Sequence, residues 1–155
     1  MNQKLIAPGL TKRLLPLTCV IVLALSSCGD DDRTSSDISK SEFVKKANSI
    51  CAQGLKEKDA VVQAGLEELA QQKKQSRASL EELADEVLPT FHRLAGKLDS
   101  LPIPSGDEEK VNRFVEQLEA GLQEADENPS LLIDQDPLRE AGATARAYGL
   151  QACNL

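Results

Sequence analysis

The stretch "SLEELADEVLPTFHRLAGKLDSL", residues 79–101, decides the fold of this 155-residue chain. Its apolar residues recur every three or four positions and therefore line one side of a helix. They are Leu80, Leu83, Val87, Leu88, Phe91, Leu94, Ala95, Leu98 and Leu101. Ser79 and Glu82 have the spacing of a capping box, which predicts the helix start. Because a helix with one apolar face must bury it against partners, the stretch predicts a helical bundle.

Two further helices are expected on either side of this one, over residues 39–72 and from about residue 106 to residue 127. The first begins with a capping box formed by Ser39 and Glu42. The other begins after the turn "LPIPSGDEE" and ends before Asn128 and Pro129. No segment of the chain shows the alternation of apolar and polar residues that indicates a strand.

A fourth helix is expected after Asp136, which caps it, with Pro137 in its first position and an apolar side that runs from Leu138 to Ala152. Its apolar side is rich in Ala and Gly, which permits close approach to a neighbouring helix. Four helices joined by short or moderate connections predict an all-α, up-down antiparallel four-helix bundle over residues 39–155.

The amino terminus has the organisation of an export signal. Residues 14–25, "LLPLTCVIVLAL", form a twelve-residue apolar run after Lys4, Lys12 and Arg13. This run is shorter than the roughly 20 residues of a membrane-spanning helix. Residues 25–28, "LSSC", resemble the bacterial lipobox. The resemblance implies that residues 1–27 form a lipoprotein signal peptide, cut by signal peptidase II between Ser27 and Cys28, and that Cys28 receives a diacylglyceryl group.

The alternative to a lipoprotein is an ordinary signal peptide with a chance cysteine.

Residues 28–38 are polar and rich in Ser and Asp, which predicts an acidic flexible tether. A diacylglyceryl group on Cys28 would hold the protein at a membrane without a spanning helix. The expected location is the bacterial cell envelope, with the protein lipid-anchored on the outer face of the cytoplasmic membrane.

Cys51 and Cys153 are the two cysteines left when Cys19 and Cys28 are assigned to the leader and the lipid. In an exported protein such a pair predicts a disulfide bond, and the absence of C-x-x-C disfavours a redox role. If both cysteines lie on helices, the first and fourth helices pack antiparallel with positions that sum to 204. That register places Val62 opposite Gly142 and Leu66 opposite Leu138.

Two motifs near the ends of the domain resemble a known group of proteins. They are F-x₃-A-x₃-C from Phe43 to Cys51 and A-x₂-Y-G-L-x₂-C from Ala145 to Cys153. The chain resembles small exported or lipid-anchored helical proteins of actinobacteria, a group of uncharacterised function. The resemblance implies a helical fold closed by this disulfide, and it implies no activity.

The charge of the chain disfavours nucleic acid as a partner. Eighteen basic and 25 acidic residues give a net charge of −7. Without the three basic residues of the leader, 15 basic residues remain against 25 acidic ones, a net charge of −10. Such a chain repels phosphate backbones.

No motif for a cofactor, a metal or a catalytic nucleophile is found, so none of these is predicted. His92 is the only histidine, and removal of the leader takes away the only methionine. Zinc and haem sites therefore lack ligands. We interpret His92 as a boundary residue at the edge of the apolar stripe.

Three functional hypotheses remain open. The favoured one is a non-enzymatic envelope lipoprotein that binds or scaffolds an envelope protein partner. The alternative is a small-molecule binding bundle, with its site near Pro89 and the small residues of the fourth helix. An enzyme, such as a wall hydrolase using Glu82, Glu86 or Glu116, is the least favoured, because carboxylates on amphipathic helices are ordinarily solvated.

Overall fold

The computed structural model describes residues 38–73 and 76–155, all of which lie in the unit that spans residues 34–155. Its helices are α1 (Lys40–Gln72), α2 (Arg77–Asp99), α3 (Glu108–Glu127), α4 (Leu131–Asp134) and α5 (Arg139–Tyr148). Within these residues there is no strand, so the all-α class is confirmed. The leader, the lipobox with Cys28, and the tether up to residue 37 lie outside the described residues. Ile38, expected to be the last residue of the tether, is buried.

The starts of the first two helices are set by serine caps. The Ser39 Oγ accepts a hydrogen bond from the Glu42 amide at 3.2 Å, as the capping box predicts. The Glu42 carboxylate does not complete the box and pairs with Lys46 at 3.0 Å. Helix α2 begins two residues before the expected Ser79, because Ser76 is the cap and accepts from the Ser79 amide.

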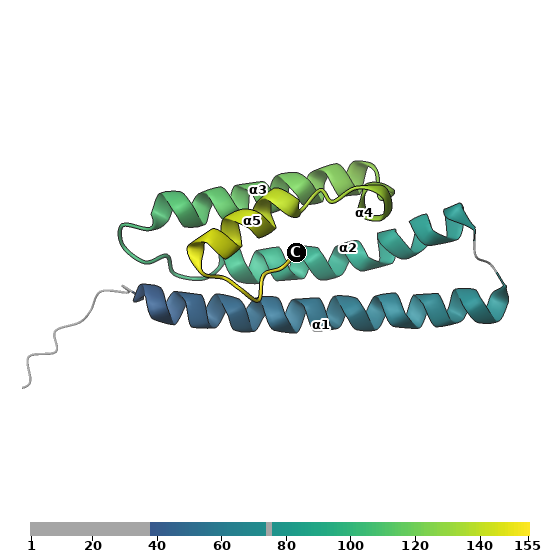
Figure 1. Cartoon of the computed structure of the whole chain (residues 1–155), viewed down its shortest axis with the longest axis horizontal. Coiled ribbons are helices and arrows are strands. Elements are labelled where there is room, and N and C mark those ends of the chain that lie inside the picture. Colours follow the sequence, from purple (N-terminus) through teal and green to yellow (C-terminus); the bar gives the residue numbers. More distant parts are fainter. Residues whose placement is uncertain (1–37, 74–75) are drawn as a thin grey trace, which may run out of the picture. The chain divides into compact units, whose positions relative to one another are not determined.

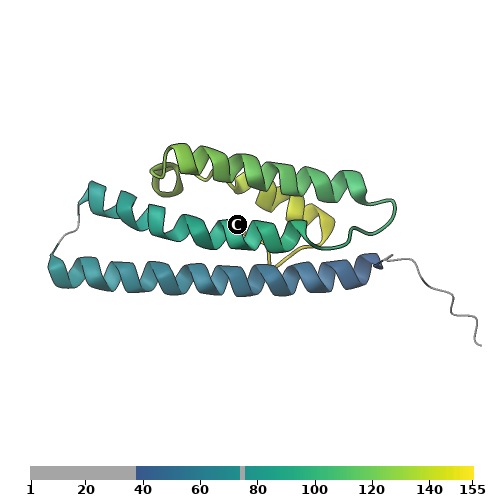
Figure 2. The same ribbon diagram turned by 180° about the vertical axis from the view of Figure 1, so that it is seen from behind.

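The long helices lie side by side in chain order, with α2 between α1 and α3 (Figures 1 and 2). Each runs antiparallel to the one before it. Helix α5 returns along α3, which places its last residue, Tyr148, beside Asp107 at the start of α3. The short helix α4 contacts α2 and α3. The core consists of the facing apolar stripes of these helices, including Leu94, Phe114 and Leu118.

The predicted lengthwise pairing of the first and last helices is wrong, because the backbones of α1 and α5 do not run side by side. The two helices meet at one end, where the Tyr148 ring contacts Phe43 and Lys40. Helix α5 ends at Tyr148 and does not reach Cys153. Gly149 has a φ of 111° and donates to the carbonyls of Ala145 and Arg146, while the Leu150 amide donates to Ala145. This is the Schellman arrangement that ends a helix, so an irregular tail carries Cys153 to α1.

The expected start of the last helix is also corrected. Asp136 provides no side-chain cap, and its carbonyl accepts from the Arg139 amide in the turn that precedes α5. Gly142, expected opposite Val62, faces the tail instead, since a Cβ at this position would lie 3.5 Å from backbone atoms of Leu155.

Helix α1 is continuous, but only its first half enters the core. Its buried residues are Phe43, Ala47, Cys51 and Gly54. Gly54 is needed for close packing, because a Cβ there would lie 2.9 Å from the Leu94 Cδ1 atom. Beyond Gly54 the helix is covered by α2 alone, so its apolar residues remain half-buried or exposed.

Candidate functional site

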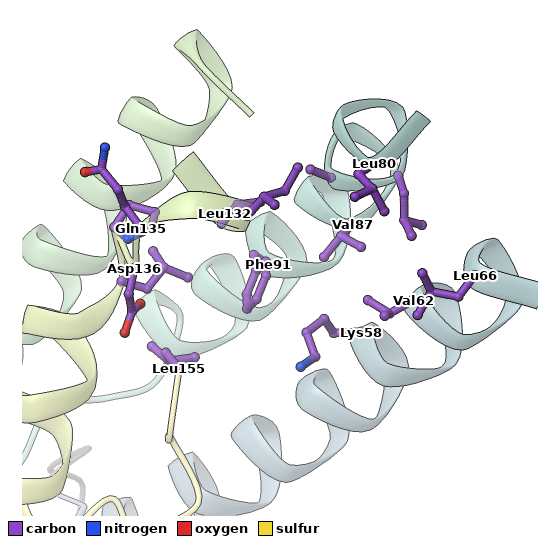
Figure 3. Close-up of a pocket in the computed structure, with 15 residues that line it drawn as sticks. Lys58, Val62, Leu66, Leu80, Val87, Phe91, Leu132, Gln135, Asp136 and Leu155 are labelled. Atoms are coloured by element: carbon purple, nitrogen blue, oxygen red, sulfur yellow. The ribbon is translucent and has the colours of Figure 1, made fainter. Parts of the chain in front are cut away.

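An apolar pocket occupies the place that a packed fourth helix would fill. It has a volume of about 350 Å³ and lies between α1, α2, the α4–α5 connection and the tail (Figure 3). The volume is at the lower end of the range usual for small-molecule sites. Pro89, near which a ligand site was expected, is exposed and does not line the pocket. No residue of α5 lines the pocket either, although Leu138, directly before α5, does.

Helices α1 and α2 form two walls of the pocket through helical spacing. Lys58, Val62 and Leu66 lie four residues apart and therefore share one face of α1. The facing residues of α2 follow the apolar stripe of the opening stretch and are Leu80, Leu83, Ala84, Val87 and Phe91. The side chains of Val87 and Phe91 are almost completely buried, so they form the floor of the pocket.

Helix α4 and the residues after it form a third wall, which Arg77 attaches to α2. The Arg77 guanidinium donates to both carboxylate oxygens of Asp134, one of them at 2.7 Å, and to Glu81 at 2.9 Å. The hydrogen bonds to Asp134 raise the pKa of Arg77 and lower the pKa of Asp134. This bidentate contact between Arg77 and Asp134 holds α4 in place, so that Leu132 and Ile133 lie over the pocket.

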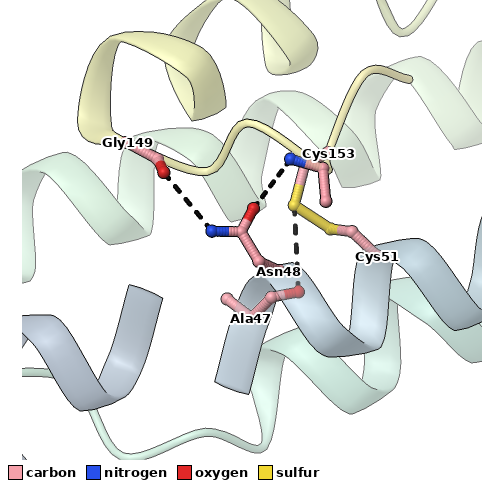
Figure 4. The surroundings of a disulfide bond; sticks show 6 residues. Ala47, Asn48, Cys51, Gly149 and Cys153 are labelled. Carbon is pink, nitrogen blue, oxygen red and sulfur yellow. Dashed lines mark hydrogen bonds between the residues drawn. A yellow bond between two sulfur atoms is a disulfide. The ribbon is translucent and has the colours of Figure 1, made fainter. Parts of the chain in front are cut away.

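The carboxy-terminal tail forms the fourth wall through Leu155. Cys51 and Cys153 are joined by a disulfide with a Cα–Cα distance of 5.0 Å, which confirms the predicted pairing (Figure 4). Asn48, one turn before Cys51, bonds to the tail with both ends of its amide. It accepts from the Ala152 amide at 2.7 Å and donates to the Gly149 carbonyl at 3.4 Å. The wall containing Leu155 is thus fixed by one covalent bond and two hydrogen bonds.

The mouth of the pocket carries apolar side chains that water can reach. Leu66 is 47% exposed and Ile133 is 38% exposed. They are the large hydrophobic side chains most exposed to solvent in the described part of the chain, and both line this pocket. Large apolar side chains that gather at one concavity indicate a binding site more strongly than scattered ones do.

A second, polar hollow of about 560 Å³ lies beyond the connection between α4 and α5. It shares Gln135, Asp136 and Pro137 with the apolar pocket. Its other charged residues are Glu124, Asp134, Arg139 and Glu140. Among the described residues no group of three or more His, Cys, Asp or Glu side chains could hold a metal ion.

The residues considered for catalysis do not assemble into one site. His92 is exposed, as a boundary residue would be, and its Nε2 atom lies 2.9 Å from the Asp126 carboxylate. The hollow beside this pair is lined by no serine, threonine or cysteine that the imidazole could activate. Glu82 and Glu86 line a small hollow of about 100 Å³, and Glu116 is not part of its lining.

No described helix is both long enough and apolar enough to cross a membrane. Comparisons of the chain with protein-family models, with curated proteins and with solved structures found no match. The pocket is therefore interpreted from its own residues.

Proposed function

We propose that the protein is a non-enzymatic binding module of the bacterial cell envelope, anchored through Cys28, and that the apolar pocket is its ligand site. The observation that carries the proposal is the concentration of solvent-reachable apolar side chains, Leu66 and Ile133, around a concavity with a buried apolar floor. Of the two binding hypotheses, this geometry favours a small apolar or amphiphilic molecule over a protein partner. A concave, mainly apolar site of this volume is typical of small-molecule pockets.

The pocket is suited to binding because its walls come from separate elements that are each held in place. Helices α1 and α2 pack directly against each other, Arg77 holds α4, and the disulfide holds the tail. A preformed site loses little conformational entropy when a ligand enters, which favours binding.

The proposal is tested with an uncharged apolar dye, N-phenyl-1-naphthylamine, whose fluorescence reports transfer from water into an apolar site. The protein is the chain of residues 28–155 with Cys28→Ser, which keeps every described residue. We expect saturable binding to this protein. Val62→Trp is expected to weaken it at least tenfold, because the indole would occupy the pocket.

Val61→Trp is the matched control, since Val61 is the half-buried neighbour on α1 that does not line the pocket. It should leave dye affinity within about twofold of the parent protein. Circular dichroism and urea midpoints of both variants verify that they are folded. Absence of dye binding, or equal loss in both variants, would contradict the proposed site.

The anchoring part of the proposal has its own test. In a bacterial host, Cys28→Ala should leave an uncut precursor without lipid, because the cysteine is both the acyl acceptor and the residue after the cut. Electrophoretic mobility and mass spectrometry measure this. Normal cleavage of the variant would exclude lipoprotein processing at Cys28.

A further inference from the structure

The pocket has an apolar end and a polar end, and this difference indicates the chemical class of its ligand. The inference rests on the proposed function of the pocket as a ligand site. In Figure 3, Leu66 and Leu80 lie toward one side of the pocket, and Gln135 and Asp136 lie toward the other. A ligand that matches both ends has an apolar body and one polar head. The charges around the polar end then decide which head is favoured.

The one lysine that lines the pocket is already neutralised. The Lys58 Nζ atom lies 2.8 Å from the Asp59 carboxylate, and the Lys58 side chain is only 30% exposed. An anionic head would have to compete with Asp59 for this charge. Asp136 contributes the opposite charge at the polar end, where it is exposed in the turn before α5.

The surroundings of the polar end add further negative charge. The polar hollow that shares Gln135 and Asp136 with the pocket contributes Glu124 and Glu140, against the single cation Arg139. The third carboxylate, on Asp134, is already paired with Arg77. The whole chain carries a net charge of −7, so the field around this end attracts cations and repels anions.

We propose that the ligand is an amphiphilic cation, with its apolar body in the pocket and its amine or ammonium head beside Gln135 and Asp136. The body lies between the α1 and α2 walls and is covered by Leu132 and Ile133. The head faces the carboxylates of the polar hollow, where water remains accessible. This arrangement leaves no charge buried and matches the sign of the local field.

The proposal is tested by competition against the bound dye with three amphiphiles that share a dodecyl chain, each used below its critical micelle concentration. They are dodecyltrimethylammonium, dodecanoate and dodecyl glucoside. We expect the cation to displace the dye at about a fivefold lower concentration than the anion, with the uncharged glucoside between them. The preference should shrink near 1 M salt, where the Debye length is about 3 Å.

Charge variants assign the preference to the polar end. Asp136→Asn should weaken binding of the cation about two- to fivefold, the range expected for an exposed charge pair. Lys58→Gln should strengthen it about twofold, because the Asp59 carboxylate loses its partner and the local charge becomes more negative. Asp99→Asn is the matched control, since it changes the net charge equally but does not line the pocket.

The outcomes separate this inference from the proposed function. If the dye binds and responds to Val62→Trp, but the three amphiphiles displace it equally or the anion is favoured, the cationic ligand class is overturned and the pocket stands. An equal effect of Asp136→Asn and Asp99→Asn would also overturn the placement of the head. If the dye does not bind at all, both proposals fail together.

Discussion

The hydrogen bond from the Tyr148 hydroxyl to Asp107, 2.8 Å long, ties the end of α5 to the start of α3. Lys40 and Lys110 lie 3.8 and 3.2 Å from the same carboxylate. The Lys40 ammonium also lies 4.3 Å from the centre of the Tyr148 ring. This cluster is the polar counterpart of the core contact between Tyr148 and Phe43, whose rings meet edge to face.

The cluster changes the pKa of both partners. Burial and the bond to Asp107 raise the pKa of Tyr148 above its ordinary value of 10.0. The bond from Tyr148 lowers the pKa of Asp107 below its ordinary value of 3.8. The carboxylate therefore stabilises the fold above its unfolded pKa, and this stabilisation is lost as pH falls through the folded pKa. The tyrosine contribution is complete below pH 10.0 and is lost as pH rises through its folded pKa.

Tyr148→Phe removes this bond and keeps the ring packing. We predict a lower urea midpoint for the variant than for the parent protein at neutral pH. The difference should decline as pH falls below 3.8, the ordinary pKa of the carboxyl, and should be lost as pH falls through the lower folded pKa of Asp107. Urea denaturation followed by circular dichroism between pH 2.5 and pH 8 measures it. A difference that is constant over this range would contradict a contribution from the ionised Asp107 carboxylate.

At the residue scale, the sequence predicted the Ser39 cap and the disulfide but not the role of Asn48. A cap is recognised from residues three positions apart, and a pair of cysteines in a chain that is expected to be exported has few alternatives. Asn48 bonds to residues 101 and 104 positions away. Its contribution depends on the path of the tail, which local spacing does not define.

At the scale of the elements, the contact between α3 and the start of α5 depends on Gly121. A Cβ at this position would collide with the Pro137 carbonyl oxygen and would lie 2.9 Å from the Leu138 Cδ2 atom. The carbonyl belongs to the backbone and cannot rotate away. The connection that carries the polar end of the pocket is therefore held close to α3 by the absence of a side chain.

Gly121→Ala should therefore destabilise the protein by about 1–3 kcal/mol, the usual cost of overpacking, despite the higher helix propensity of alanine. Gly96→Ala is the matched control, because Gly96 also lies inside a helix and a Cβ there would meet nothing within 4 Å. This control should gain about 0.5–1 kcal/mol. The free energies of unfolding in urea measure both effects, and stabilisation by both variants would contradict the close contact.

The elements also show where sequence periodicity stops being informative. The small and apolar residues continue past the end of α5 through Ala152, so the periodicity extends the expected helix to Cys153. The actual end is set by the backbone of Gly149, which adopts a left-handed conformation. The end of the helix could have been predicted from Gly149 and Leu150, because glycine followed by an apolar residue commonly ends a helix.

At the scale of the whole molecule, the disulfide closes the described unit and supports the pocket at the same time. It links positions 102 residues apart, and Leu155 lines the pocket two residues after Cys153. All-α folding could be predicted because the apolar stripes repeat along the chain. The pocket could not, because its walls come from α1, α2, the connection between α4 and α5, and the tail, and local spacing does not define how these distant segments meet.

Reduction of the disulfide should lower both stability and ligand affinity. The expected loss of stability is about 2–5 kcal/mol, the usual range for removal of a native disulfide. Dye affinity should fall several-fold, because the released tail no longer holds Leu155 in place. Urea denaturation and dye titration with and without a phosphine reductant measure both effects. Cys153→Ser should behave like the reduced protein and be insensitive to the reductant, and unchanged affinity would show that the tail is not a wall of the site.

The most direct test of the central claim is the position of a bound apolar molecule, measured by intermolecular nuclear Overhauser effects in isotope-labelled protein with N-phenyl-1-naphthylamine. We expect contacts from the dye to the methyl groups of Val62, Leu66 and Val87, and none to Val61 or to Val111 in the core. Contacts to Val61 or Val111, without contacts to the three pocket residues, would contradict the claim.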